Sequence, residues 1–561
     1  MNKTISDDPL WALYYENDAF TVSGEKIMGR QAAGNSMLKA YAKSGYNPIG
    51  AYASNKDSFN SFVKEFKKVL PEKFSTDKNV EYIPWTKPSE LMKYGGVFYP
   101  APDIDKLVDQ RYFFGSNNYS IVGITHTTAS QGAINSILSC YTSPLAPWDA
   151  LICTSNSVKN SINTIYDQYY DVLKKRLGAT KKPDFEIPVI PLGVHNEDYQ
   201  VDSKEIQNKR DSLDIGKDDI VILFLGRLSF HAKAHHVPMY IALEEVSKNL
   251  PKDVNLHLIQ TGWFPNNSVE EMYKVDAKRI SPSVRMHFLD GRDQEIKKLS
   301  YAVADIFISL VDNFQETFGL TPLEGMAAGL PVVVSDWDGY KDTVRNEIDG
   351  FTVNTTTMKP GSGFEYALRY NFGVDNYDHY IGRTSQTVSV DIKDCIKKIT
   401  LLATNKELRL KLGLNAKKRA KDFEWDKILK KYKNLKDLLD NKRKISIDNK
   451  ETFIPPVRIQ DPHTFFNDYA SFNLNDNTII NFNGEMKIIG IDELYQFSSI
   501  SYLDGIAPDI ALIKDVFSKI KNTKAISFKK LMLNIDIDYL LLSRIILWLS
   551  KYGFISLEDE K

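Results

Sequence analysis

The sequence predicts an α/β protein with two doubly wound, Rossmann-like domains that face a cleft, followed by a small C-terminal domain. Three observations support this fold class. Short apolar segments ending in Gly, Ser or Thr recur through the first two thirds of the chain, separated by helical patterns. Their apolar character is continuous rather than alternating, which is typical of parallel strands buried on both faces. The length of 561 residues is too great for one core and suggests about three domains.

The expected strands form two groups, separated by the polar segment Tyr199–Asp214, which is poor in strand-forming residues. The first group comprises Gly96–Tyr99, Ile121–Thr125, Leu151–Thr154 and Ile187–Leu192, and the second comprises Ile220–Leu225, Asn255–Ile259, Val284–Leu289, Asp305–Leu310 and Pro331–Ser335. Ligands of doubly wound domains bind beyond the carboxyl ends of the strands. We therefore expect a binding cleft between the two sheets.

The domain boundaries follow from changes in composition. We assign residues 1–205 to the first domain, 206–420 to the second, 421–443 to a helix, 445–465 to a linker and 466–561 to an accessory domain. Thr355–Asp394, which is irregular and rich in Gly, Tyr and Asn, is interpreted as an insertion. The pattern over Pro508–Leu557 is helix, short helix, longer helix and strand, which indicates an α+β, winged-helix-like module. Over Ser501–Lys561 the charge is nearly balanced, with about nine Lys and Arg against eight Asp and Glu, which favours protein interaction or dimerisation over nucleic-acid binding.

Composition restricts the class of protein. The chain has 71 basic and 72 acidic residues and is 43% hydrophobic, which excludes a disordered chain and a general nucleic-acid binder. Cys140, Cys153 and Cys395 have neither metal-ligand spacing nor a paired framework, which indicates a reducing compartment. The polar N-terminus and the lack of an apolar run of about 18 residues lead us to expect a cytoplasmic protein. The Lys-rich segment Asp426–Lys444 is either a solvated face or a peripheral contact with the inner face of an anionic membrane.

The segment E-T-F-G-L-T-P-L-E, Glu316–Glu324, carries the first candidate site residues. Thr321 and Pro322 read as the start of a helix, and Glu324 would complete a capping box with Thr321. Gly319 would let the backbone approach a ligand closely, and the first turn would favour an anion. Glu316 lies upstream of the helix, where capping does not explain it.

The second segment is G-R-L-S-F-H-A-K-A-H-H, Gly226–His236, directly after the apolar run I-V-I-L-F-L. Arg227 and Lys233 would lie at the carboxyl end of a parallel strand, where phosphate groups commonly bind. Arg offers a planar fork and Lys a point charge, and a diphosphate can use both. The alternative is a solvated basic loop.

Together with G-M-A-A-G-L-P-V-V-V-S-D, these segments resemble the family-4 retaining glycosyltransferases of the GT-B fold, over roughly Ile187–Val353. The resemblance implies that Arg227 and Lys233 hold the diphosphate of a nucleotide sugar and that Glu316 faces the transferred sugar. It further implies that Glu324 binds the ribose and that the sugar and phosphates contact Phe318, Gly319, Leu320 and Thr321. V-I-P-L-G-V-H-N-E-D-Y resembles the family's entry to the hinge, with His195 where an Asp is usual.

The N-terminal half resembles the family more loosely. I-M-G-R-Q-A-A-G resembles a glycine-rich loop opening a helix, so Gly29 and Gly34 are donor-binding candidates, although their spacing departs from the usual adjacent glycines. His126 ends an apolar run at the expected cleft, where members of the family often place a histidine, and is a catalytic candidate. A-K-D-F-E-W resembles the segment before the helix that crosses back to the first domain, which is 421–443 here.

No metal or further cofactor is expected. The Asp-x-Asp candidates, Asp103-Ile-Asp105 and Asp536-Ile-Asp538, do not follow convincing core strands, whereas Arg227, Lys233 and a helix N-terminus can supply positive potential. The sequence therefore predicts metal-independent transfer from a nucleotide sugar to a glycan, a lipid-linked glycan or a protein. No nucleophile is evident, so retention by front-face attack enters only through the resemblance. The alternatives are a nucleotide-sugar epimerase of the same fold and a non-catalytic nucleotide-sugar-binding scaffold.

Overall fold

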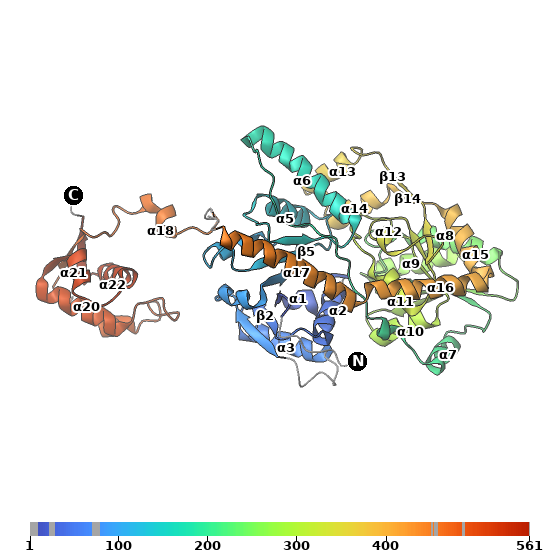
Figure 1. Ribbon diagram of the computed structural model, residues 1–561, viewed down its shortest axis with the longest axis horizontal. Coiled ribbons are helices and arrows are strands. Elements are labelled where there is room, and N and C mark those ends of the chain that lie inside the picture. The colour runs from blue at the N-terminus through green and yellow to red at the C-terminus, as the bar shows by residue number, and fades with distance from the viewer. Residues whose placement is uncertain are drawn as a thin grey trace. The chain divides into compact units, whose positions relative to one another are not determined.

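The computed structural model describes residues 9–21, 29–69, 79–449, 453, 458–484 and 489–559. The chain divides into two compact units, Met1–Pro456 and Val457–Lys561 (Figure 1). The first unit contains two lobes, each built on its own six-stranded sheet.

The first lobe has a parallel sheet with the strand order β3-β2-β1-β4-β5-β6, which is the order of a dinucleotide-binding Rossmann domain. Its strands are β1 (Ala12–Tyr14), β2 (Ile49–Ala53), β3 (Val80–Pro84), β4 (Gly96–Tyr99), β5 (Ser120–Ile124) and β6 (Ala150–Ile152). Its helices are α1 (Asn17–Phe20), α2 (Gly29–Lys43), α3 (Lys56–Val69), η2 (Pro88–Tyr94), α4 (Asp105–Tyr112), α5 (Gln131–Thr142) and α6 (Asn156–Leu177). All residues of β1, β2, β4, β5 and β6 are buried, as continuous apolar runs predict.

The second lobe repeats this topology, with the order β12-β11-β10-β7-β8-β9. Its strands are β7 (Ile220–Leu225), β8 (Leu256–Gly262), β9 (Val284–Asp290), β10 (Ile306–Ser309), β11 (Val332–Ser335) and β12 (Gly350–Val353). Its helices are η3 (Asn196–Tyr199), α7 (Ser203–Ser212), α8 (His236–Lys248), α9 (Asn267–Ile280), α10 (Gln294–Val303), α11 (Leu320–Ala328), α12 (Tyr340–Thr343), α15 (Ile392–Thr404), α16 (Lys406–Ala420) and η4 (Lys421–Phe423). Two Rossmann-order sheets in one compact unit confirm the predicted GT-B architecture.

The segment that the sequence led us to expect as irregular is folded. The strands β13 (Thr355–Thr357) and β14 (Val388–Val390) pair antiparallel and enclose α13 (Phe364–Asn371) and α14 (Tyr377–Ser385). We call α13 and α14 with their connections, residues 358–387, the insert. Its side chains are largely exposed, so no buried apolar period marked its helices in the sequence.

The helix α17 (Trp425–Asp448) runs across the first lobe (Figure 1) and completes that lobe's core with Trp425, Ile428 and Tyr432. Four of its lysines form ion pairs within the unit: Lys427, Lys433, Lys436 and Lys442. Lys436 lies 2.7 Å from Asp440, and Lys442 lies 2.6 Å from Glu186 of the first lobe. These ion pairs favour the solvated, structural interpretation of the Lys-rich segment.

One expected strand is absent. Ile187–Leu192 is not a strand, although Val189 forms a single parallel bridge to Cys153 beside β6. Pro188 and Pro191 lack the backbone N–H groups that a ladder needs, which explains the interruption.

The second unit has a three-stranded antiparallel sheet with the order β16-β15-β17. Its elements are α18 (Pro462–Phe465), η5 (Asn467–Tyr469), β15 (Ile479–Phe482), α19 (Ile491–Tyr495), α20 (Ile510–Thr523), β16 (Ala525–Ser527), α21 (Phe528–Leu533), α22 (Tyr539–Lys551) and β17 (Ile555–Glu558). The helices and last strand follow the predicted order, with the short strand β16 added. Among the described helices of the chain, none is both long and apolar enough to cross a membrane.

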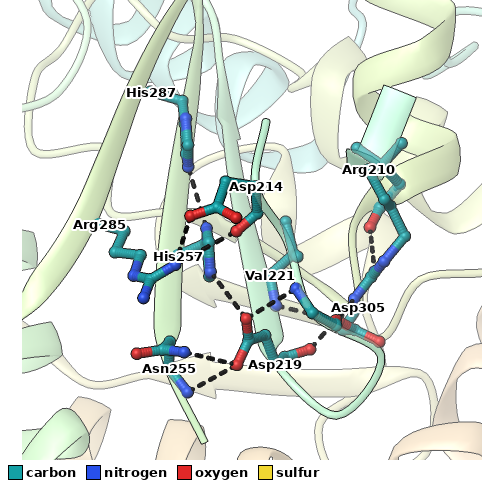
Figure 2. Close-up of polar contacts among 11 residues, drawn as sticks. Arg210, Asp214, Asp219, Val221, Asn255, His257, Arg285, His287 and Asp305 are labelled. Carbon is teal, nitrogen blue, oxygen red and sulfur yellow. Dashed lines mark hydrogen bonds and ion pairs between the residues drawn. The ribbon is translucent and has the colours of Figure 1, made fainter. Parts of the chain in front are cut away.

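A buried polar network holds the amino ends of the second lobe's strands (Figure 2). His257 on β8 lies between two partners, with its Nε2 3.2 Å from Asp219 Oδ2 and its Nδ1 3.0 Å from His287 Nε2 on β9. Burial lowers the pKa of both histidines, that of His287 to about 4. Both rings are therefore neutral at pH 7, with His257 donating to Asp219 and accepting from His287.

This network predicts acid sensitivity of the fold. Between pH 6.5 and 4 an unfolded histidine binds a proton that native His287 does not, so the free energy of unfolding falls as pH falls. We expect His287 to account for about 2 kcal/mol of the loss between pH 7 and 5. His287→Gln should reduce this pH dependence in urea titrations at the two pH values. An unchanged difference between pH 7 and 5 would contradict the assignment.

Candidate active site

The loop after β7 carries both predicted cations. Lys233 Nζ donates to Glu316 Oε2 at 2.5 Å, and both side chains are mostly buried. Arg227 Nη2 donates to the carbonyl of Ala232 at 3.3 Å, and burial lowers the pKa of Arg227. The structure thus brings Lys233 and Glu316 together at the carboxyl ends of β7 and β10. Ligands of doubly wound domains bind beyond these ends of the strands.

Glu316 is held as a carboxylate. Burial on its own raises the pKa of Glu316, but the charge and hydrogen bond of Lys233 outweigh burial and the net pKa is lowered. The backbone N–H groups of Thr317 and Phe318 add to this effect and lie 3.2 and 3.4 Å from Glu316 Oε1. An ionised acid is therefore fixed in a partly buried position.

Gly319 is required by close packing. Its φ is +89°, and a Cβ there would lie 1.9 Å from the ring of Tyr340. The hydroxyl of Tyr340 in turn lies 2.9 Å from Ser309 Oγ at the end of β10. Glycine therefore lets the loop from Glu316 to Gly319 lie directly on the Tyr340 ring.

The predicted capping box is wrong. Helix α11 begins at Leu320 with Gly319 as its N-cap, so Thr321 is already inside the first turn. The left-handed conformation open to glycine lets the helix start before Thr321. Thr321 Oγ1 is buried and, among the described residues, has no hydrogen-bond partner. The first-turn N–H groups of α11 are therefore not capped by a side chain.

Glu324 has other partners instead. It is 5% exposed, accepts from Lys297 Nζ at 2.7 Å through Oε1, and accepts from the Tyr301 hydroxyl at 2.8 Å through Oε2. Tyr301 also donates to the carbonyl of Thr321 at 3.1 Å. Lys297 and Tyr301 lie on α10, and no local sequence pattern marked them as neighbours of Glu324.

His126 follows β5 in the first lobe. Its Nε2 lies 2.9 Å from the carbonyl of Pro100, and burial lowers its pKa to about 4. A carbonyl accepts only, so Nε2 carries the proton of a neutral ring and Nδ1 is left as the acceptor.

The two donor-binding candidates among the glycines of the first lobe differ in their surroundings. Gly29 opens α2 and is unobstructed, whereas a Cβ at Gly34 would lie 2.0 Å from the carbonyl oxygen of Ala19. Gly34 is therefore explained by the packing of α2 on α1. Arg30, between them, forms an ion pair with Asp18 and lies close enough to His126 to lower its pKa. Ile27 and Met28, the first two residues of the predicted glycine-rich segment, lie outside the described residues, and the rest of the segment belongs to α2.

Thr317, which follows Glu316, contacts the first lobe directly, and Gln315, which precedes it, contacts the insert. Thr154 Oγ1 donates to the carbonyl of Thr317 at 3.2 Å. On the other side, Gln315 Oε1 accepts from the Tyr377 hydroxyl at 3.2 Å, and the Thr127 side chain of the first lobe lies close enough to that hydroxyl to act on its pKa, which Thr127 lowers. Glu316 therefore lies where the two lobes meet.

A further acid of the second lobe, Asp338, contacts the first lobe at the start of α6. Asp338 Oδ1 accepts from Ser155 Oγ at 2.9 Å, and Asp342 accepts from the backbone N–H of Asn156 at 2.6 Å. Burial raises the pKa of Asp338 to about 7, and the charge of Glu316 adds to this rise. The hydrogen bond from Ser155 opposes the rise in part. Asp338 and Ser155 are far apart in the chain, so sequence reasoning gave no sign of this contact.

The described residues contain no group of three or more His, Cys, Asp or Glu side chains that could hold a metal ion. One acid of each Asp-x-Asp candidate has a local partner. Asp103 lies 3.1 Å from Lys106, and Asp538 caps α22 by accepting from the N–H of Leu541 at 2.8 Å.

Two lobes with Rossmann-order sheets, with a mostly buried Lys–Glu pair where they meet, have the architecture of the GT-B fold. Residues 205–359, which span β7 to β13, match the family described as Glycosyl transferases group 1. The match contains Arg227, Lys233, Glu316 and Glu324. The chain thus carries a group 1 glycosyltransferase domain in its second lobe.

Curated relatives carry glycosyltransferase names. An uncharacterized glycosyltransferase of Methanocaldococcus jannaschii is 23% identical over 36% of this chain and 46% of its own length. Alpha-monoglucosyldiacylglycerol synthase of Acholeplasma laidlawii is 24% identical over 44% of this chain and 60% of its own length. The alignments thus reach only about half of these relatives.

Solved structures with similar folds include Anabaena HepE in complex with UDP-glucose, with 15% identity and a TM-score of 0.45 over 75% of this chain and 98% of that chain. Sucrose-phosphate synthase of Thermosynechococcus elongatus has 16% identity and a TM-score of 0.47 over 77% of this chain and 99% of that chain.

Proposed function

We propose that this protein is a family-4 type retaining glycosyltransferase that moves a sugar from a nucleoside diphosphate sugar to an acceptor. The observation that carries the proposal is the ion pair between Lys233 and Glu316, at the carboxyl ends of the second lobe's strands and against the first lobe. Its cation suits a diphosphate, and its anion suits a sugar that becomes cation-like during transfer.

The phosphates would be bound by charge and by backbone. Arg227 and Lys233 supply two cations, and the uncapped first turn of α11 supplies N–H groups and the positive end of the helix dipole. Lys233 would contact the diphosphate while still bonded to Glu316, since an ammonium group has three donors. The loss of a charged nucleoside diphosphate is thereby stabilised as the glycosidic bond breaks.

The sugar would lie between Glu316 and the first lobe. Glu316 is ionised and can hydrogen-bond sugar hydroxyls or stabilise the positive charge that develops at the anomeric carbon. His126 is neutral, and its Nδ1 can accept a hydrogen bond from a sugar hydroxyl. Glu324, kept in place by Lys297 and Tyr301, would bind the ribose. Front-face attack with retention rests on the family resemblance.

The acceptor is a glycan, a lipid-linked glycan or a protein. A relative named for a glucosyldiacylglycerol product favours a lipid or a lipid-linked acceptor. We place the reaction in the cytoplasm, where the three buried cysteines stay free. The second unit, which the family match does not cover, would serve protein interaction or dimerisation.

We further propose that transfer needs neither a metal nor another cofactor, because two cations and a helix N-terminus already supply the positive potential. The test is a turnover assay with UDP-, GDP-, ADP- and TDP-sugars, preceded by a thermal-shift screen of the same donors. We expect one base to raise Tm, turnover to require an acceptor, and activity to persist in EDTA. Loss of activity in EDTA with rescue by magnesium or manganese would disprove metal independence, and turnover without acceptor would favour an epimerase.

A further inference from the structure

The insert lies beyond the group 1 match, which ends at residue 359, yet it contacts the proposed active site. Its second helix, α14, begins with Tyr377 beside the loop that carries Glu316, and its first helix, α13, carries Tyr370. Neither helix is needed to complete a Rossmann sheet. The contacts of the insert therefore call for an explanation of their own.

Tyr377 joins the two halves of the proposed site. Its hydroxyl donates to Gln315 Oε1 at 3.2 Å, and the Thr127 side chain of the first lobe lies close enough to this hydroxyl to act on its pKa. Gln315 precedes Glu316, and Thr127 follows His126. A single phenol thus connects the two loops that hold the proposed acid and the proposed histidine.

A second tyrosine of the insert, Tyr370, also contacts the first lobe. The hydroxyl of Tyr370 accepts from the backbone N–H of Gln131 at 3.3 Å, in the first turn of α5. This N–H is one of those that a helix leaves without an intrahelical partner. The ring of Tyr370 stacks on Tyr380 with centroids 4.8 Å apart and lies 6.2 Å from the ring of Tyr377. Three rings of the insert therefore form one rigid group against the first lobe.

The insert also reaches the phosphate loop. Asp378 Oδ1 lies 3.9 Å from His231 Nε2, and its charge acts to raise the pKa of Arg227. The Nε2 amide of Gln315 donates to the carbonyl of Ala232, which also accepts from Arg227. Tyr377 therefore hydrogen-bonds Gln315, and Gln315 in turn contacts the loop that carries Arg227 and Lys233, the cations proposed to bind the diphosphate.

We propose that the insert is a cross-lobe brace and that Tyr377 is a positioning residue, which fixes the separation between the His126 loop and the Glu316 loop. This inference rests on the proposed function. Transfer requires groups from both lobes at one anomeric carbon, and displacement of a reacting group by about 1 Å can cost about 100-fold in rate. The brace would secure this geometry without touching the substrate itself.

The test is Tyr377→Phe in the full chain, which removes the hydroxyl and keeps the ring. We expect kcat to fall about 10- to 100-fold, with the Kd for the matching nucleoside diphosphate changed less than about threefold and Tm nearly unchanged. The control is Tyr366→Phe on α13, whose side chain the brace does not use. Thr127→Val should lower kcat similarly, and the double variant should be little worse than either single variant.

Amide hydrogen exchange provides a readout that does not need activity. In Tyr377→Phe we expect amides of residues 126–131 and 315–318 to exchange about 3- to 10-fold faster, because the hydrogen bond to Gln315 and the contact of the hydroxyl with Thr127 are lost. Tyr366→Phe should leave both segments unchanged. A wild type that turns over no donor but shows this exchange pattern would refute the function and keep the brace. Unaltered exchange, or unaltered or increased kcat, in Tyr377→Phe would overturn the brace.

Discussion

Replacing Glu316 with glutamine is expected to lower kcat by about 100- to 1,000-fold. Loss of one group that stabilises charge in a transition state typically has an effect of this size. Glutamine keeps the volume and one carbonyl acceptor, but it removes the negative charge that would face the cation-like sugar. Lys233 would then be without its buried counter-ion, 2.5 Å away in the wild type, and would be freer to bind phosphate. Affinity for the nucleoside diphosphate should therefore stay the same or increase.

The two quantities are measured separately, kcat by product formation and Kd by calorimetry with the diphosphate that stabilises the wild type. The control is Glu270→Gln, which removes an exposed acid of the same lobe from its pair with Lys274. Glu316→Ala should lose transfer at least as completely as the glutamine variant. Wild-type kcat in Glu316→Gln would show that this carboxylate does not act on the sugar.

The second lobe was largely predictable because its strands are short and apolar, and four of them, β7, β8, β10 and β11, are fully buried. Runs such as I-V-I-L-F-L and V-V-V-S correspond to β7 and β11 within a residue or two. The strands of the first lobe were less predictable. Its strand β2, I-G-A-Y-A, is buried but carries small residues and little hydrophobic contrast with the flanking segments. Conversely, Ile187–Leu192 is apolar enough for a strand but is interrupted by two prolines.

The site was predictable where chemistry depends on neighbours in sequence. The spacing of Arg227, Lys233, Glu316 and Glu324 followed from motifs, and the first three lie around one loop pair. The error at Thr321 arose because a local capping rule was applied without knowledge of Tyr340, whose ring makes Gly319 the N-cap. Contacts such as Ser155 with Asp338 and Thr127 with Tyr377 are set by lobe packing, which leaves no periodic or local signal.

Replacing Lys233 with alanine is expected to have the largest effect on donor binding. Charge-assisted contacts of an ammonium with a diphosphate are among the stronger hydrogen bonds, so we expect Kd for the nucleoside diphosphate to rise about 10- to 100-fold and kcat/KM to fall about 1,000-fold. Lys248→Ala, which removes an exposed lysine of the same lobe, is the control. Unchanged diphosphate affinity in Lys233→Ala would remove this residue from the phosphate site.

The difference in stability between the same variant and the wild type should depend on pH. Without Lys233, burial is the main influence on Glu316, so its pKa should rise above the unfolded value instead of lying below it. A raised native pKa means that the folded state binds the extra proton, so Lys233→Ala should lose stability relative to the wild type as pH rises from about 4 to 7. Adding Glu316→Gln should abolish this loss in urea titrations without restoring diphosphate binding. If the double variant kept the pH dependence, the Lys233–Glu316 pair could not be its source, and the buried charge would have to be compensated elsewhere.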